Sequence, residues 1–565
     1  MTDAVHWKPE PDLLATLDNA VPEILASQHP NGRFGTDPWI CQDQNVLLAL
    51  AAAWSLPESR YHGCENVLDA IVRGGNALID DMDEEGRWIF RKKDYSEWGM
   101  IRMPWTYSRW IRAYQIVREH LRDADRHRWD AALRLGYGKV AEHDIGRTHN
   151  IPAHHAMGLF CAGIVFDEPT WRESARSLLH RVVGTQTAEG WWTEHCGPVV
   201  TYGMVYVEAL GVYCSLTQSI SAPDGFVLDA LERAARFHAG WVYPDGSAVE
   251  VIDERNPYHT GVRLGNPGFS HTKTGRGFLL HQHNLLRSTG EAFAADYAAN
   301  MLLFAGSGEA EEIVAGRGTA DGALGENALA HRRRPWFVAM SAFTSELTES
   351  RWIQDRQNFV SVFHDRCGLI LGGGNTKLQP LWSTFTVGDT ALLRQTPGDE
   401  EPEFSPPEGL RHVPDSARAV LENGVPVLTL NYEDVRCRVT VRADNPEAAI
   451  LTYELLSGSL PSESAERIEA HVPFLPHLGE RLSLSSGESV ELGEASVAWE
   501  LDADGWLEHG GWRATLPKGT RVVWPALPHN PYRKDGHAEI DEGRVVAILP
   551  LSADSPRAEV TLTVR

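Results

Sequence analysis

Cysteine is scarce and scattered in this chain. Its 565 residues include seven cysteines, an odd number, and no Cys-X-X-Cys pair occurs. Such usage is typical of a reducing compartment, and it argues against a zinc site built from thiolates. The sequence therefore predicts neither a disulfide framework nor a thiolate metal centre.

Positive charge and long apolar runs are also lacking. Lys and Arg number 52 against 77 Asp and Glu, which gives a formal net charge of −25. Nucleic acids are bound by basic surfaces, so we expect no nucleic-acid partner. No apolar run is long enough to span a bilayer, and MTDAVHWKPEPDLL has no basic segment followed by an apolar one. We expect a cytoplasmic protein with no membrane partner.

Tryptophan, in contrast, is abundant. The chain has 19 Trp beside 14 Tyr and 17 Phe, and many of the Trp lie next to glycine in turn-like stretches. Large aromatics dominate protein cores, and core packing is one interpretation. Trp191 and Trp192 are close in sequence to Glu194 and His195. A flat face beside polar groups suits a sugar ring, so we expect these two Trp to contact substrate.

The first ~330 residues carry apolar side chains at helical spacing. Predicted helices include residues 46–54, 109–121, 128–143, 171–183, 203–216 and 226–241. Between helices a glycine turn with aromatic or charged neighbours recurs at Gly32, Gly86, Gly146, Gly190 and Gly246, with gaps of 54, 60, 44 and 56 residues. This period fits helical hairpins, which must stack or close into a ring to bury their apolar faces.

After about Arg334 the sequence changes to strand and turn patterns. Residues 358–374, 425–457 and 497–527 are rich in alternating Val, Thr, Leu and Trp, with Gly, Pro, Asn and Asp between. We predict a β-sandwich. The change occurs within residues 318–336, where AHRRRPW is interpreted as a linker. The predicted domains are residues 1–330 and 331–565 of a multidomain α+β protein.

Three residues are the main candidates for chemistry. Asn150 begins a predicted helix in GRTHNIPAHHAMG, His195 lies in WWTEHCGP, and Tyr202 lies in VTYGMVY. A ring of hairpins could bring all three to one cleft. Helix capping is the alternative role for Asn150. Tyr206 is the alternative to Tyr202, although core packing suits it better, and His154 or His155 could replace His195.

The order of Asn150, His195 and Tyr202 in a helical region that is followed by a β-domain resembles the arrangement in the polysaccharide lyases of the (α/α)-toroid type. That group includes hyaluronate, chondroitin and xanthan lyases, and more distantly the heparinase II/III-like enzymes. The resemblance implies an N-terminal (α/α) toroid followed by an antiparallel β-sandwich. It also implies that Asn150 and His195 neutralise a uronate carboxylate and that Tyr202 acts as base, acid or both. The β-domain stretch LILGGGNTKLQPLWSTF lacks the His-Gly-His of heparinases, so the hyaluronate-lyase arrangement fits better.

An anionic sugar also requires cationic partners. Guanidinium groups bind carboxylates through paired hydrogen bonds, which makes arginines near the glycine turns candidates for substrate binding. These are Arg102, Arg147, Arg255 and Arg276, and Tyr258 and His259 add a second polar cluster. Surface ion pairing is the alternative for each arginine. His281 with His283, or Asp253 with Glu254, lacks the spacing of known metal motifs, so we expect no metal and no cofactor.

We therefore predict a carbon–oxygen lyase that cleaves a uronic-acid-containing glycan by β-elimination and leaves an unsaturated uronyl end. Its partner would be an acidic oligosaccharide. A glycoside hydrolase on the same architecture is one alternative, and it would pair Glu194 with Glu250 or Asp253 across the bond. A non-catalytic glycan-binding protein is the other.

Overall fold

The computed structural model describes the chain at residues 5–9, 11–195, 197–218, 220, 223–255, 261–316, 318–346, 348–353, 359–374, 376–392, 399–456 and 467–565. Contacts divide it into two compact units. The first comprises Met1–Trp192, Tyr202–Ala239 and Leu264–Ile313, and the second comprises Thr193–Thr201, Gly240–Arg263 and Val314–Arg565. Two segments from the helical half are thus grouped with the β-domain.

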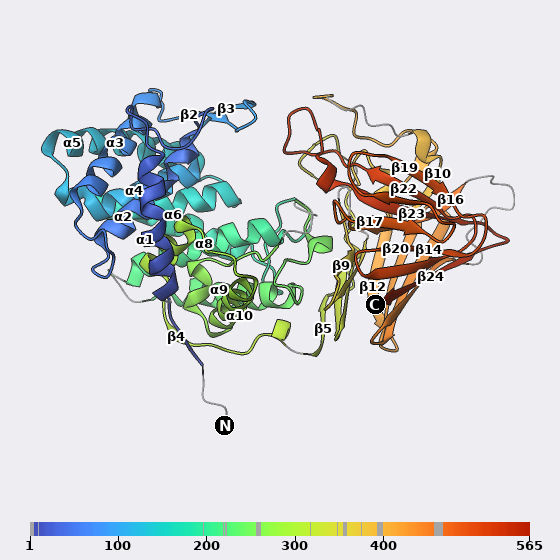
Figure 1. Ribbon diagram of the computed structural model, residues 1–565. Helices are drawn as coiled ribbons and strands as arrows, with labels where there is room; N and C mark the ends of the chain where they lie inside the picture. Colours follow the sequence, from blue (N-terminus) through green and yellow to red (C-terminus); the bar gives the residue numbers. More distant parts are fainter. Residues whose placement is uncertain are drawn as a thin grey trace. The chain divides into compact units, whose positions relative to one another are not determined.

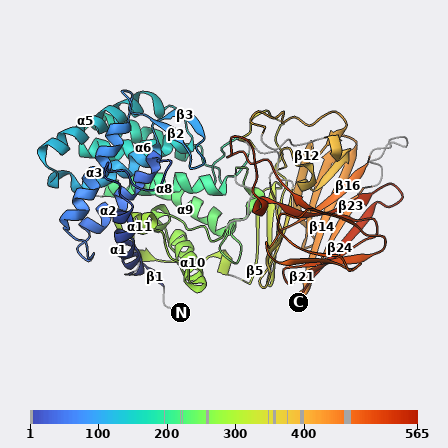
Figure 2. The same cartoon turned by 45° about the horizontal axis from the view of Figure 1, so that its top comes forward.

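The first unit is built from helices, coloured blue to green in Figures 1 and 2. The described residues form eleven: α1 (Pro11–Ala26), α2 (Val46–Ser55), α3 (Glu65–Asp81), α4 (Pro104–Val117), α5 (Asp123–Lys139), α6 (Asn150–Val165), α7 (Pro169–Gly184), α8 (Val200–Gln218), α9 (Gly225–Gly240), α10 (Lys273–Thr289) and α11 (Ala295–Phe304). Each of the six segments predicted from apolar spacing lies mainly in one of them.

Several helices pack against others close to them in the chain, and the last returns to the first. Helix α4 contacts α2 and α6, and α11 contacts both α1 and α2. Strand β1 (His6–Trp7) pairs antiparallel with β4 (Gly308–Glu309), so the start of the helical region is joined to its end. The predicted toroid of helical hairpins is confirmed. A small hairpin of β2 (Trp88–Arg91) and β3 (Glu97–Ile101) precedes α4.

Four of the five glycine-headed loops adopt the same turn. Gly32, Gly86, Gly190 and Gly246 have φ values of 84°, 74°, 97° and 84°. In each, the glycine N–H donates to the carbonyl three residues earlier, whose own N–H donates to the carbonyl after the glycine. A positive φ favours glycine, which explains the repeat in the sequence. Gly146 differs, because it follows the π-helical segment Val140–Asp144 and has no positive φ.

The second unit contains two large antiparallel sheets. One comprises β5 (Thr319–Leu324), β6 (Ala328–Arg333), β7 (Trp336–Ser341), β8 (Val360–His364), β9 (Gly368–Leu371), β10 (Phe385–Gly388), β11 (Leu410–Arg411), β16 (Ile468–Phe474), β19 (Val497–Glu500), β22 (Arg521–Ala526) and β23 (Arg544–Leu551). The other comprises β12 (Ser416–Glu422), β13 (Val425–Tyr432), β14 (Val435–Asn445), β15 (Ala448–Leu455), β17 (Arg481–Leu484), β18 (Ser489–Glu491), β20 (Gly505–His509), β21 (Trp512–Leu516) and β24 (Arg557–Val564).

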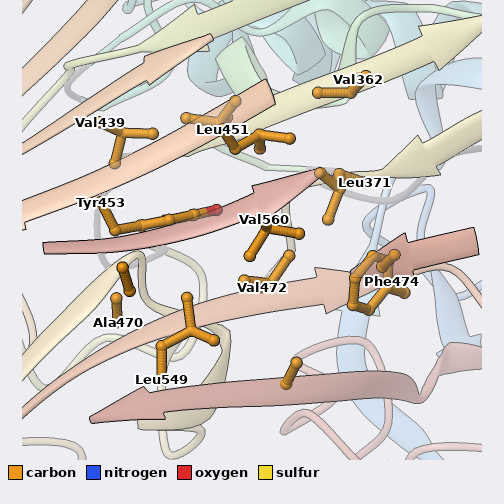
Figure 3. Packing of buried hydrophobic residues seen from close by; sticks show 14 of the residues in the cluster. Val362, Leu371, Val439, Leu451, Tyr453, Ala470, Val472, Phe474, Leu549 and Val560 are labelled. Atoms are coloured by element: carbon orange, nitrogen blue, oxygen red, sulfur yellow. The ribbon is translucent and has the colours of Figure 1, made fainter. Parts of the chain in front are cut away.

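The core of this unit forms where the inner faces of the two sheets meet. Figure 3 shows Ala470, Val472 and Phe474, alternate residues of β16, near Leu451 and Tyr453 of β15. The period of two along each strand places every second side chain in this core, as expected for a sandwich. The predicted antiparallel β-sandwich is confirmed.

The segment interpreted as a linker is instead part of a sheet. Residues 330–336 lie in β6 and β7 and the turn between them. Arg332 is 2% exposed and donates to the carbonyls of Ala315 and Val242, at 3.1 and 2.9 Å. A run of three arginines looks solvated in the sequence, but strand alternation directs Arg332 inward, where backbone carbonyls satisfy its donors.

Candidate active site

Asn150 is the first residue of α6, and its side chain is buried, with 3% of the residue exposed. The capping position is His149, which makes no side-chain capping hydrogen bond. Asn150 therefore does not take the capping role that the sequence allowed. An amide buried at the mouth of a helix is suited to binding a polar group.

Tyr202 lies in the first turn of α8 and is partly buried. Tyr206, one turn later, is 2% exposed and stacks on Trp192, with ring centroids 5.0 Å apart and planes at 19°. Trp192 is also 2% exposed and donates from Nε1 to the carbonyl of Val182 at 2.9 Å. Trp192 is thus a core residue of the first unit, and the predicted sugar contact of this pair rests on Trp191, which is half-buried.

Side-chain contacts fix the relative direction of three helices of the first unit. Ser108 Oγ of α4 lies 2.9 Å from His154 Nε2 of α6, and Cys161 Sγ of α6 donates to Gln115 Oε1 of α4 at 3.3 Å. Both pairs are separated by 46 residues, so α4 and α6 run parallel.

Helix α8 runs in the same direction. Arg112 of α4 forms a buried ion pair with Glu208 at 3.8 Å, and the ring of Phe160 in α6 contacts that of Tyr213 at 4.8 Å. Asn150 lies ten residues before Phe160, and Tyr202 eleven before Tyr213. At ~1.5 Å of rise per residue these are about equal distances along the helices. Asn150 and Tyr202 are therefore level at the same end of neighbouring helices.

The two histidines considered as substitutes for His195 are both buried in the first unit. His154 is fully buried, and burial holds its pKa well below the ordinary value. Burial also lowers the pKa of His155 to about 4. Both rings are neutral near pH 7, so neither supplies the positive charge that a carboxylate partner would provide best.

Two of the predicted site residues, His195 and Arg255, lie in the second unit and contact each other. Arg255 Nη1 lies 3.3 Å from His195 Nε2 and 4.0 Å from Glu194 Oε2. A guanidinium can only donate, so His195 accepts at Nε2 and carries its proton on Nδ1. The Glu194 side chain is fully buried, and Arg255 is 9% exposed. The pair therefore combines a fixed positive charge with an oriented imidazole.

Buried carboxylates shape the loop that carries His195. Glu254 Oε1 accepts the N–H of His195 at 2.7 Å, and the N–H of Glu254 donates to the carbonyl of Pro198 at 3.1 Å. Asp253 accepts from the N–H of Thr201 through Oδ2 and from that of Arg255 through Oδ1, both at 2.9 Å. These acids serve the backbone of segments 193–201 and 250–255.

Glu250 is also occupied by structural hydrogen bonds. It is 1% exposed, and its two oxygens accept from the Tyr243 hydroxyl at 2.8 Å and from the N–H of Gly373 at 2.9 Å. A Cβ on Gly372 would lie 3.0 Å from Glu250 Oε1. The absence of a Cβ at Gly372 thus allows the chain after β9 to approach this carboxylate closely.

The remaining predicted arginines have different surroundings. Arg102 is paired with Asp144 at 3.0 Å and donates to the carbonyl of Glu85 at 3.0 Å. Arg276 donates to the carbonyls of Glu309 and Ser270, at 2.7 and 2.8 Å. Arg147 is exposed. Of the four, Arg255 is the one that contacts another predicted site residue among the described residues.

Tyr258 and His259 lie outside the described residues. Within the described ranges, no group of three or more His, Cys, Asp or Glu side chains is arranged to hold a metal ion. His283, one of the histidines weighed as a ligand, bonds through Nε2 with the Tyr297 hydroxyl at 2.5 Å. None of the helices in the described part of the chain is long and apolar enough to cross a bilayer.

Two aromatic residues that contact Arg255 were not predicted from the sequence. The Arg255 guanidinium lies 5.8 Å from the ring centroid of Trp352, and the Tyr532 hydroxyl donates to the carbonyl of Arg255 at 2.7 Å. The two rings are 5.8 Å apart, at 56°. They come from β-domain loops separated from Arg255 by about 100 and almost 280 residues, and no local pattern marks them.

Comparison of the structure with solved structures shows clear similarity. A chondroitinase AC lyase, solved in oligosaccharide complexes, matches with a TM-score of 0.55 and 11% identity over 98% of this chain and 82% of that one. A Paenibacillus xanthan lyase matches with a TM-score of 0.54 and 10% identity over 98% of this chain and 57% of that one. Heparinase III matches with a TM-score of 0.52 and 13% identity over 100% and 85%.

Sequence comparison alone gives no such result. No protein-family model matches the chain, and no curated protein is significantly similar to it in sequence. At 10–13% identity, the structural matches establish the fold and not the individual residues. The chain has the fold of the toroid polysaccharide lyases, a helical (α/α) toroid followed by an antiparallel β-sandwich.

Proposed function

We propose that the protein is a polysaccharide lyase that cleaves a uronic-acid-containing glycan by β-elimination. The shared fold supports a lyase, and the His195–Arg255 pair is the observation that carries the assignment. Two groups with N–H donors, one permanently charged, lie 3.3 Å apart beside a buried Glu194. Such a pair suits an anionic oxygen better than a neutral sugar hydroxyl.

The reaction begins with removal of the proton on the carbon next to the uronate carboxylate. In the proposed mechanism the Tyr202 oxygen, as phenolate, takes this proton, and the electron pair of the C–H bond moves toward the carboxylate. A double bond then forms between the α and β carbons as the β C–O bond breaks. The Tyr202 hydroxyl returns the proton to the leaving oxygen, so the cycle ends as it began.

The carboxylate gains negative charge during proton removal, and donors placed in advance stabilise it. In the proposed assignment Arg255 supplies charge, His195 donates from Nδ1, and Asn150 donates through its amide. Donors aimed at developing charge contribute about 10²–10³ in rate each when they are removed singly.

The hydrolase alternative has less support. It requires two carboxyl groups able to exchange protons across the bond. Both oxygens of Asp253 accept backbone N–H bonds, and both oxygens of Glu250 accept bonds from Gly373 and Tyr243. These hydrogen bonds give both acids a structural role. Glu194 then lacks the partner that a hydrolase needs.

A panel of uronic-acid oligosaccharides tests the proposal. Hyaluronan, chondroitin, heparan, xanthan and alginate fragments would be incubated with the enzyme while ultraviolet absorbance of the unsaturated uronyl product is recorded. We expect absorbance to rise with at least one of them, in proportion to the new reducing ends. New reducing ends without absorbance would indicate hydrolysis and would reject elimination. Binding without any cleavage would indicate the glycan-binding alternative.

A further inference from the structure

Loops of the β-domain surround Arg255 with aromatic and immobilised polar groups. Trp352 and Tyr532 both contact Arg255, Trp352 through its ring and Tyr532 through its hydroxyl. All of these residues belong to the second unit, and both aromatic side chains are only partly buried. The sequence pointed to Trp191 and Trp192 for sugar contact, but Trp192 lies in a helical core.

Two cations, Lys377 and Arg351, hold the loop that carries Trp352, and the first of them is buried. Lys377 is fully buried, and its Nζ donates to the carbonyls of Thr348 and Ser350, at 2.8 and 3.1 Å. Burying an ammonium group costs free energy unless strong acceptors surround it. Because the Lys377 ammonium donates to two carbonyls of one loop, it holds that loop in one conformation.

Arg351 fixes the same loop to its neighbours. Its guanidinium donates to the carbonyls of Lys534, Glu400 and Arg533, at 3.0, 3.2 and 3.4 Å. The Lys534 and Arg533 carbonyls belong to the loop of Tyr532, so Arg351 connects the two aromatic loops. Side chains that position substrate act best when their own rotamers and loops are fixed before binding.

We propose that Trp352 forms a sugar-binding subsite, in which the indole face stacks on a pyranose ring of an acidic oligosaccharide next to the residue whose carboxylate Arg255 binds. Lys377 and Arg351 are positioning residues that hold this face in place. Arg255 lies between the Trp352 subsite and the site of the neighbouring uronate, and it selects a glycan with a negative charge adjacent to the stacked ring. This inference rests on the proposed function for the role of Arg255.

The test compares Trp352→Ala with Trp352→Phe and with a matched control. Trp506→Ala is the control, because Trp506 is also a partly buried Trp of the second unit with a guanidinium over its ring, that of Arg513 at 4.0 Å. Affinity for tetrasaccharides of the same uronide panel would be measured by titration calorimetry. We expect at least tenfold weaker binding with Trp352→Ala, a two- to threefold loss with Trp352→Phe, and no change with Trp506→Ala.

The role of Lys377 has its own readout. With 5-fluorotryptophan incorporated, the fluorine resonance of Trp352 should shift or broaden in Lys377→Met, while that of Trp506 stays unchanged. Unaltered affinity in Trp352→Ala would overturn the subsite, whether or not the enzyme cleaves the panel. Binding that depends on Trp352 without any elimination would support the subsite and count against the proposed lyase activity alone.

Discussion

At the scale of single residues, two tyrosines one helical turn apart have different surroundings. Tyr202 is partly buried in the first turn of α8, whereas Tyr206 is stacked on Trp192 in the core. In the proposed mechanism only the Tyr202 hydroxyl moves protons. We expect Tyr202→Phe to reduce kcat by a factor of about 10³ or more, with little change in the unfolding temperature.

Tyr206→Phe is the matched control for this substitution. It removes the same atom from the same helix, and we expect it to retain turnover within a few-fold. Steady-state rates on the best uronide would be compared with thermal unfolding of each variant. Near-normal turnover in Tyr202→Phe would show that another group acts as the base.

Two of the predicted substrate-binding arginines also differ in their surroundings. Arg255 contacts His195, whereas Arg276 donates to two backbone carbonyls. Lysine keeps the charge but loses the paired geometry. We expect Arg255→Lys to lower kcat/KM by about 10²-fold, in line with loss of one well-placed donor, and to leave stability nearly unchanged.

Arg276→Lys should show the opposite pattern, with lower thermal stability and unchanged kcat/KM well below the unfolding temperature. Both variants would be assayed with the same oligosaccharide and at the same distance below their own unfolding temperatures. Equal activity losses in the two would remove Arg255 from its assigned role.

At the scale of elements, the glycine turns fix how the hairpins of the toroid meet. A Cβ on Gly190 would lie 2.1 Å from the carbonyl oxygen of Arg233, and its φ is 97°. The corresponding Cβ on Gly32 would lie 2.3 Å from the carbonyl oxygen of Arg73. The same close approach of turn to helix therefore occurs twice in the ring.

Gly190→Ala should destabilise the protein. The left-handed backbone costs roughly 1–2 kcal/mol for a residue with a Cβ, and the clash with Arg233 adds to this. Gly146→Ala is the control, since nothing lies within 4 Å of its Cβ position and its φ is not positive. Denaturant unfolding should show a lower midpoint for Gly190→Ala alone. Equal midpoints for both variants would mean that the turn is not strained.

At the scale of the whole molecule, buried histidines link stability to pH. Burial lowers the pKa of His155, His271, His283 and His529 to about 4, against 6.5 as the ordinary value. Between these values the unfolded chain binds protons that the folded chain does not. Stability is therefore fully present above about pH 6.5 and is lost as the pH falls toward 4.

For each histidine, every unit by which its pKa is lowered corresponds to about 1.36 kcal/mol of stability lost over this range. Glu469 extends it to lower pH, because His471, Arg521 and Arg467 outweigh the effect of burial and lower its pKa to about 2. The loss of stability would be measured by thermal unfolding at constant ionic strength from about pH 7.5 to about pH 4. This range spans the ordinary and the lowered histidine pKa values. A flat unfolding temperature across that window would contradict the assigned pKa shifts.

The sequence by itself determined the two halves of the protein. Helical spacing of apolar residues, period-two alternation in strands and recurrent turn glycines are local signals, and together they predicted a helical half and a β-rich half. Asn150 and Tyr202 stay candidates predicted from the sequence, because their motifs lie at the starts of helices, and the fold places them level on neighbouring helices.

Tertiary structure alone decided what the remaining side chains do. Trp192 belongs to a core, Glu250 and Asp253 serve backbone N–H groups, and Arg332 is buried in a strand. Trp352 and Tyr532 reach Arg255 only through folding. The physical reason is that burial and the choice of hydrogen-bond partner depend on contacts between residues tens to hundreds of positions apart, which no short-range pattern records.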